Sequence, residues 1–252
     1  MLKKTHKQEL VKHLVKLGLK KDQKIVLHAN LATFGIPSVN FPDFVIKSIL
    51  EILGPNGSLI MPMYNLNLNP KIIYDKKKLY NIRAISSIYK EFFKVKEKII
   101  SNSFVHRHFG IGENIDFLGH GDPGISLGKN SDFEKFYQNN FLLVLLGCKP
   151  SEGATYLHHL ESIKKVPYRT WINLPRKILD KKKLDIKIKY FARKNSNFKE
   201  DFDKVFEYKT ISSKTKKIGN KYGFSFMINI KDLHNAGLKI LNKNIYAFVK
   251  KK

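Results

Sequence analysis

The sequence predicts an α/β fold: a central mixed, partly parallel sheet flanked by helices, with an α+β lobe at the C-terminal end. Three apolar runs are typical of buried strands: Lys24–Ala29, 58–63 and 141–147. Helical patterns lie between them, and this alternation favours parallel strands. After Pro175 the buried apolar runs give way to segments in which apolar and polar residues alternate. We expect one domain over residues 1–252, with the lobe at about 176–252.

The first half of the chain supplies the helix and strand signals in turn. An apolar stripe at helical spacing, ended by Gly18, predicts the first helix: Leu10, Leu14, Val15 and Leu17. Pro42 fits the first turn of a second helix, whose apolar face is Val45, Ile46, Ile49, Leu50 and Leu53. The turn at 54–57 leads into strand 58–63. A further helix is expected near 86–93.

The second half contains the strongest strand signal. Residues 141–147 are apolar on both faces, so this strand should lie centrally, and a helix over 155–165 follows it. Segments 184–193 and 223–230 alternate apolar and polar residues, as half-exposed strands do. Residues 201–208 predict a short helix, and 230–241 an amphipathic one.

The charge of the chain favours anionic small molecules. It has 252 residues, and its 47 basic and 21 acidic residues give +26. Only five of the cations are Arg, which base-reading and bidentate phosphate sites prefer because of its planar fork. We therefore expect no specific nucleic-acid partner. The positive electrostatic field of such a chain attracts an anionic ligand, such as coenzyme A or a sugar nucleotide.

Other features of the sequence indicate in which cellular compartment the protein is found. A single cysteine excludes a disulfide framework and a Cys-rich zinc site. No apolar run approaches the ~18 residues of a membrane span, and the start has no signal-peptide pattern. A cytoplasmic protein without a membrane partner is expected. The sequence also allows a homodimer.

His158 and Glu161 form the most informative pair. Three residues apart, they share a face of the predicted helix. A carboxylate beside His can orient the ring and raise its basicity. The pair could instead point separately at substrate, or be a surface His with a solvated Glu. His159 faces another direction on the helix, so we do not expect it to take part in the chemistry.

Two further sets of residues are weaker candidates. His106 and His108, joined by His120 and Asp122, would suit a metal-dependent hydrolase if brought together, but their spacing matches no zinc signature. We expect no metal. Cys148 ends the central strand, yet nothing nearby supplies a base, so a buried residue is favoured over a nucleophile. The glycines of 119–128 form neither a P-loop nor a dinucleotide-binding motif.

Taken in order, several motifs resemble the aminoglycoside 3-N-acetyltransferase family, which uses coenzyme A and does not have the GNAT fold. LGLKKDQKIVLHANLATFG (17–35) is similar to its first motif, and GSLIMPM (57–63) to its second. NSFVHRH (102–108) resembles the family's Arg-Ser-x-x-Pro-x-His segment, and GKNSDF (128–133) its Gly-x-x-Ser-Pro segment. TYLHHLE (155–161) matches its most specific element, Thr-x-hydrophobic-His-x-x-Glu. VPYR (166–169) resembles members that act in surface-sugar biosynthesis.

This resemblance implies transfer of an acyl group from acetyl-CoA or another acyl-CoA to an amine, without an acyl-enzyme. The amine is largely ammonium at neutral pH, so a general base must take its proton. The candidate base is His158, with Glu161 orienting it or binding the ammonium. The oxyanion formed on the thioester needs a donor, for which groups near Asn30 or Ser103 are candidates.

The resemblance also assigns binding residues. The pantetheine arm of the coenzyme is expected along Ala29, Asn30, Leu31, Ser103 and Phe104. The candidates for binding the acceptor are Tyr64, Asn65, Thr155 and Arg169.

The chain departs from the family pattern where the acyl donor should bind. Ala29 and Asn30 replace paired serines, Asn102 replaces an Arg, and His106 replaces a Pro. These changes could suit a different acyl group, weaken donor binding, or leave a member that binds coenzyme A without catalysis.

The expected acceptor is a nucleotide-linked amino sugar that is used in surface-polysaccharide assembly. The reason is that a chain with a net charge of +26 repels polycationic aminoglycosides. Acetylation of an aminoglycoside antibiotic is the alternative. From other classes, a metal-dependent hydrolase and a non-catalytic polyanion-binding protein stay open.

Overall fold

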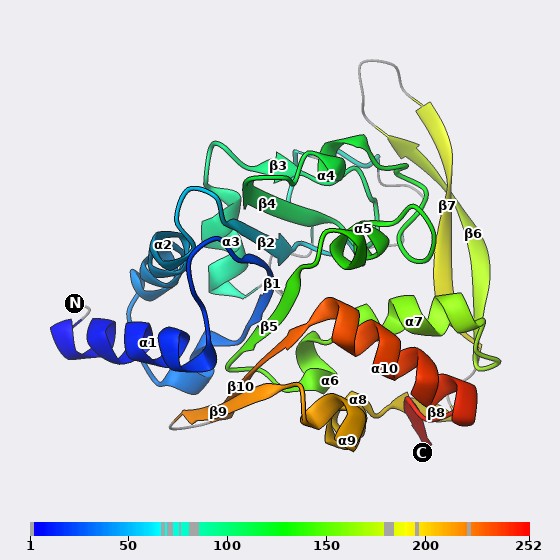
Figure 1. The fold of residues 1–252 in the computed structure, drawn as a ribbon. Coiled ribbons are helices and arrows are strands. Elements are labelled where there is room, and N and C mark those ends of the chain that lie inside the picture. Colours follow the sequence, from blue (N-terminus) through cyan, green and yellow to red (C-terminus); the bar gives the residue numbers. More distant parts are fainter. Residues whose placement is uncertain are drawn as a thin grey trace.

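A computed structural model describes residues 3–66, 69, 73–75, 77–80, 86–178, 184–194, 197–220 and 223–252. Its largest sheet has seven described strands in the order β3-β4-β2-β1-β5-β10-β9 (Figure 1). In chain order they are β1 (Lys24–Ala29), β2 (Ser58–Pro62), β3 (Ile99–Ile100), β4 (His108–Gly112), β5 (Leu142–Leu146), β9 (Lys216–Asn220) and β10 (Gly223–Asn229).

The sheet is mixed, as predicted. Strand β1 pairs in parallel with β2 on one side and with β5 on the other. The outer pairings are antiparallel: β4 with β2 and β3, and β10 with β5 and β9. The predicted α/β class with a partly parallel central sheet is confirmed, and the run at 141–147 supplies an interior strand.

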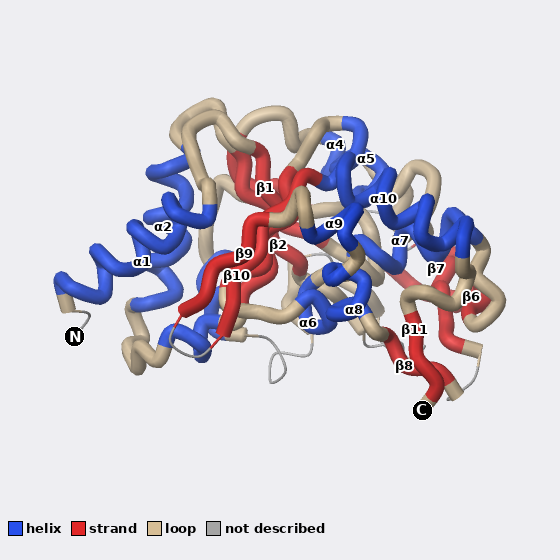
Figure 2. The backbone as a smooth tube through the Cα atoms, turned by 60° about the horizontal axis from the view of Figure 1, so that its bottom comes forward, coloured by secondary structure: helices blue, strands red, loops and turns tan. Residues whose placement is uncertain are grey.

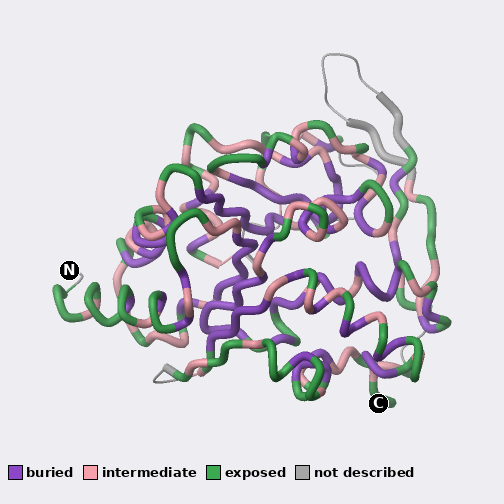
Figure 3. Tube along the Cα trace, in the orientation of Figure 1, coloured by how far each residue is buried: buried purple, intermediate pink, exposed green. Residues whose placement is uncertain are grey.

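Helices cover both faces of this sheet (Figure 2). One layer holds α1 (Lys4–Leu17), α2 (Phe41–Leu53) and α3 (Ser87–Phe93), and the other holds α5 (Asp132–Gln138), α7 (Tyr156–Lys164) and α10 (Ile230–Lys243). Alternate residues of β1 enter the two layers: Ile25 and Leu27 pack in one core and Val26 in the other. The inner strands are therefore buried on both faces (Figure 3).

Helix α1 shows how the local pattern sets these layers. Leu10, Leu14 and Leu17 are buried, but Val15 is 56% exposed because it is turned about 100° from Leu14. Gly18 ends the helix with φ +106°, and its N–H bonds the carbonyl of Val15. This left-handed conformation favours glycine.

The C-terminal third contributes to the central sheet as well as to two small sheets. Its strands β9 and β10 extend the central sheet, and α10 packs on α7. Two small sheets lie apart: the hairpin of β6 (Arg169–Ile178) and β7 (Leu184–Arg193), and the pair of β8 (Phe198–Glu200) and β11 (Val249–Lys251). Short elements complete the chain: η1 (Leu31–Phe34), α4 (Phe117–His120), α6 (Pro150–Gly153), α8 (Phe202–Glu207) and α9 (Lys209–Ser212).

The β6–β7 hairpin stands beside α7 at the right of Figure 1. Both strands of this hairpin therefore lie next to the helix that carries His158. Within the described ranges, none of the helices has the length and apolar character that crossing a bilayer requires.

Candidate active site

Helix α7 brings His158 and Glu161 into direct contact. The Nδ1 atom of His158 lies 2.6 Å from Oε2 of Glu161. The His158 side chain is 21% exposed, whereas that of Glu161 is fully buried. Because Nδ1 faces the carboxylate, Nε2 is the nitrogen left for a reacting group. The contact that helical spacing permitted is therefore made.

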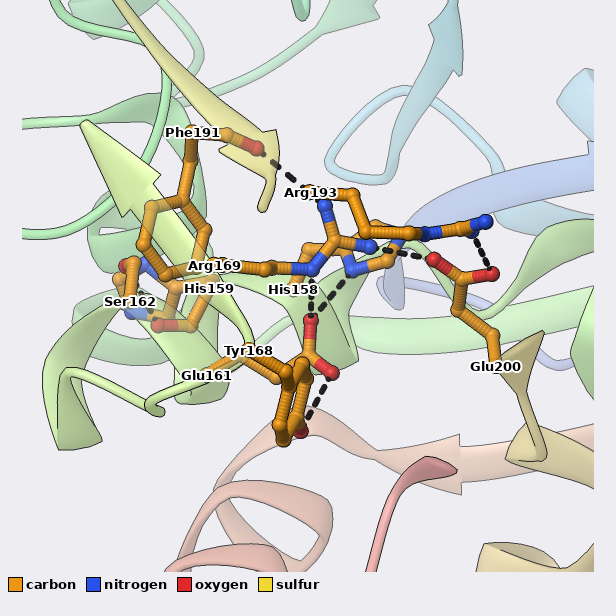
Figure 4. Close-up of polar contacts among 9 residues, drawn as sticks. All are labelled: His158, His159, Glu161, Ser162, Tyr168, Arg169, Phe191, Arg193 and Glu200. Carbon is orange, nitrogen blue, oxygen red and sulfur yellow. Dashed lines mark hydrogen bonds and ion pairs between the residues drawn. The ribbon is translucent and has the colours of Figure 1, made fainter. Parts of the chain in front are cut away.

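Two more side chains hold the Glu161 carboxylate (Figure 4). The hydroxyl of Tyr168 donates to Oε1 at 2.9 Å, and Nε of Arg169 lies 3.0 Å from Oε2. A buried carboxylate is stable as an anion only when it is paired and hydrogen-bonded in this way. The Glu161 carboxylate is thus fixed in position against the imidazole of His158.

Arg169 connects Glu161 to a second carboxylate. Its guanidinium also donates to the carbonyl of Phe191 at 3.2 Å and pairs with Glu200, which itself pairs with Arg193. Burial alone would raise the pKa of Glu200, but the hydrogen bond from Arg193 and the charge of Arg169 outweigh it and hold the pKa below its usual value. The charges of this network are paired within the protein.

A cavity of about 340 Å³ opens beside the dyad. Of the predicted site residues, Tyr64, Thr155, His158 and Arg169 line it. Seven residues in its wall were not predicted for this role: Leu66, His106, Leu127, Tyr190, Phe191, Arg193 and Glu200. The cavity therefore joins α7 to the β6–β7 hairpin and to the segments that follow β2 and precede β4.

Asn65, the remaining predicted acceptor residue, is buried, and its N–H donates to the carbonyl of Val105 at 2.8 Å. It is not among the residues that line the cavity.

The segments predicted to bind the coenzyme have different neighbours. The N–H of Ala29 donates to the Tyr89 hydroxyl at 3.0 Å, and that of Asn30 to the carbonyl of Leu146 at 2.9 Å. Leu31 is buried as the first residue of η1. The main-chain N–H of Asn30 is therefore committed to the sheet and is not a free donor for an oxyanion.

Ser103 and Phe104 lie elsewhere, between β3 and β4. The Ser103 N–H donates to Ser101 Oγ at 3.0 Å, so this N–H is also committed, while its own buried Oγ has no hydrogen-bond partner. Phe104 packs on Tyr74, with ring centroids 4.4 Å apart. Of the two suggested oxyanion donors, the hydroxyl of Ser103 is the one left unpaired.

The residues of the metal hypothesis do not converge. His108 Nδ1 pairs with Asp132 at 2.8 Å inside the core. His120 is exposed at the end of α4, and Asp122 is exposed and accepts the N–H of Gly124 at 2.7 Å. Among the described residues, no group of three or more His, Cys, Asp or Glu side chains could hold a metal ion.

Cys148 and His159 are both buried away from the cavity wall. Burial raises the pKa of the Cys148 thiol to about 12, so it is not a thiolate at neutral pH. His159 accepts the N–H of Gly128 at 3.1 Å, and burial lowers its pKa to about 3. His159 is therefore a neutral core residue, and His158 is the member of the His-His pair that reaches the cavity.

A buried carboxylate–imidazole pair that opens on a small cavity is an arrangement that can accept a proton from a bound group. The family model described as aminoglycoside 3-N-acetyltransferase matches residues 26–242. The chain belongs to this family and is an N-acyltransferase, as the motifs indicated. The predicted co-substrate class, acetyl-CoA or another acyl-CoA, is that of the family. No relative was found among the curated proteins.

Solved structures show the same fold at low identity. A histidine-to-alanine variant of aminoglycoside acetyltransferase AAC(3)-IVa, in complex with a gentamicin, is 20% identical, with a TM-score of 0.80 over 98% of this chain and 92% of that one. The YokD protein from Bacillus subtilis is 19% identical (TM-score 0.79; 95% and 94% covered). AAC-IIIb, in a binary complex with CoASH, is 16% identical (TM-score 0.76; 94% and 96% covered).

Proposed function

We propose that this enzyme moves an acyl group from acyl-CoA to the amino group of a nucleotide-linked amino sugar, with His158 as general base. The observation that carries the proposal is the contact between His158 and the fully buried Glu161 at the wall of the cavity. A base held in this way has one defined ring orientation and one nitrogen facing the substrate.

The proton balance follows from that geometry. The sugar ammonium first loses one proton to solvent. As the neutral amine nitrogen attacks the thioester carbonyl it becomes positively charged, and Nε2 of His158 takes a second proton from it. The Glu161 carboxylate stabilises the imidazolium that forms, because Oε2 lies 2.6 Å from Nδ1. The carbon–sulfur bond then breaks, and the coenzyme A thiolate leaves and receives the proton. No covalent enzyme intermediate is needed, in agreement with the buried, protonated Cys148.

The charges in the cavity wall support an acceptor that is not a polycation. Glu200 is the one carboxylate among the described lining residues, and it is already paired with Arg169 and Arg193. A polyamine would need free acidic groups, whereas a phosphate-bearing sugar suits the +26 chain. We place aminoglycosides second, supported by solved relatives in complexes with a gentamicin and with apramycin.

The test follows thiol release from acetyl-CoA with UDP- and dTDP-linked amino sugars, kanamycin and gentamicin. His158→Ala should lower kcat by about 10²–10⁴-fold, while calorimetry at about 150 mM salt shows unchanged acetyl-CoA binding. His120→Ala, a change of an exposed histidine outside the cavity, is the matched control. Faster turnover of the antibiotics would reverse the order of acceptors, and unaltered turnover by His158→Ala would remove the proposed base.

A further inference from the structure

His106 lies beside the candidate base in a position fixed by backbone pairing. Beyond the last paired residues of β2 and β4, the N–H of Met63 donates to the carbonyl of Arg107 at 2.7 Å, and the N–H of Asn65 to that of Val105 at 2.8 Å. Tyr64 and His106 consequently lie side by side, with ring centroids 5.0 Å apart and planes at 86°. Both line the cavity together with His158.

The imidazole of His106 has an unused polar atom. The residue is 8% exposed, and its buried Nδ1 has no hydrogen-bond partner. The neighbouring His108 also keeps one nitrogen unpaired, but it pairs its other nitrogen with Asp132 and is not in the cavity wall. An unpaired buried nitrogen is costly, so a substrate hydroxyl that bonds it after the imidazole turns toward the cavity gains affinity.

His106 is also held neutral. Burial lowers its pKa well below the usual value, and the nearby charges of His158, His108 and Arg169 lower it further. A neutral imidazole offers one donor and one acceptor, and it does not repel the ammonium of an incoming amine. Thr155 and Tyr64 add neutral hydroxyls to the same wall. Such a set of groups matches sugar hydroxyls.

We infer that His106 is a specificity-determining residue that binds the acceptor's hydroxyl on the carbon next to the reacting amine. The assignment rests on the proposed function, since it requires the sugar amine to lie at His158.

The test uses UDP-glucosamine, which has an amine on C2 and a hydroxyl on C3, and its 3-deoxy analogue, with acetyl-CoA as donor. The main variant is His106→Phe, which keeps a ring against Tyr64 and Phe133 but lacks the nitrogens. His106→Asn restores a donor and an acceptor. The matched control is His28→Phe, because His28 also packs on Tyr64 (6.2 Å between centroids) but is not in the cavity wall.

The wild type should prefer the 3-hydroxyl sugar by about 10-fold in kcat/KM, the range of one hydrogen bond. His106→Phe should remove this preference through a higher KM for UDP-glucosamine, with the pH profile of kcat unchanged and the melting temperature no lower. His106→Asn should recover part of it, and His28→Phe should keep all of it.

The two proposals fail in different ways. Turnover in which wild type and His106→Phe discriminate equally between the two sugars overturns the role of His106 and leaves His158 as base. A fall in kcat with an altered pH profile would likewise contradict a role in specificity. Absence of thiol release with these sugars and with every other amine tested contradicts the proposed function itself, and the assignment of His106 falls with it.

Discussion

Arg169 contacts the same carboxylate oxygen of Glu161 that holds His158. Its Nε lies 3.0 Å from Oε2, and Nδ1 of His158 lies 2.6 Å from that atom. One oxygen therefore serves a permanent cation and the imidazole together. The arginine is thus a second, positively charged partner of this buried carboxylate, beside the imidazole.

We expect Arg169→Met to destabilise the fold by about 3–5 kcal/mol, because it leaves Glu161 as an incompletely paired buried charge. Urea unfolding measures the change in the free energy of unfolding. The double variant Arg169→Met, Glu161→Gln should recover part of the loss, since both charges are then absent. Equal losses in the single and double variants would contradict the coupling.

Glu161→Gln should lower kcat by about 10²-fold or more, because a neutral amide cannot stabilise the imidazolium of His158 and can favour the wrong ring tautomer. The matched variant is Glu200→Gln, which removes the other carboxylate of Arg169 without touching His158. The pH profile of kcat should change more in the first variant than in the second, because Glu161 contacts His158 directly whereas Glu200 acts on it only through its charge. Equal changes of kcat and of its pH profile in the two variants would show that the Arg169 network affects activity only through the stability of the protein.

The fold should lose stability as the pH falls below about 6.5. Burial holds the pKa of His28 and of His159 at about 3 and lowers that of His106, whereas an unfolded His titrates near 6.5. Below pH 6.5 the unfolded chain binds protons that the folded chain does not. Each of these histidines then costs about 1.4 kcal/mol per pH unit. This contribution is fully present above pH 6.5.

Urea unfolding at pH 7.0 and 5.5 checks this dependence. His159→Gln should weaken it, because one of the contributing imidazoles is removed. The same free energy of unfolding at both pH values in the wild type would refute the expectation.

Cys148 should resist thiol reagents in the folded enzyme. Its pKa is raised to about 12 by burial, and its thiol donates to the carbonyl of His28 at 3.6 Å. A chromogenic disulfide reagent should label it only after denaturant is added, and Cys148→Ala should retain acyl transfer. Rapid labelling of the native protein would instead place a reactive thiolate near the site.

Gly147→Ala should destabilise the protein by at least about 2 kcal/mol. Gly147 follows β5 with φ +66°, and an added Cβ would lie 2.1 Å from Thr33 Oγ1 and 2.6 Å from the carbonyl oxygen of Asn30. Gly119→Ala is the control, because the nearest atom there would be 3.8 Å away. Urea unfolding of both variants should separate them clearly, and similar stabilities would contradict the strain at Gly147.

The sequence predicted best those features that depend on neighbouring residues. The apolar run at Lys24–Ala29 is strand β1 over the same residues, and the spacing of His158 and Glu161 led to a real contact. Both follow from period and side-chain type, which local sequence carries.

Features made by distant segments were missed. Strand β6 was not predicted because it contains Pro175, which is unusual inside a strand, yet its backbone pairs with β7. Glu200 reaches Arg169 only through the packing of β8, 31 residues further along the chain. Alternating residues predicted the strand at 223–230, but nothing local indicates that it pairs with β5.

The pairing of β10 with β5 also affects how the chain folds while it is being synthesised. Strand β5 at Leu142–Leu146 bonds β1, made long before it, and β10, whose last residue is Asn229. A nascent chain that has not yet reached β10 therefore carries an open sheet edge in its centre, where another chain can pair. The central sheet of this enzyme can therefore be completed only after β10 has been synthesised, and a chain that stops before β10 keeps the edge of β5 unpaired.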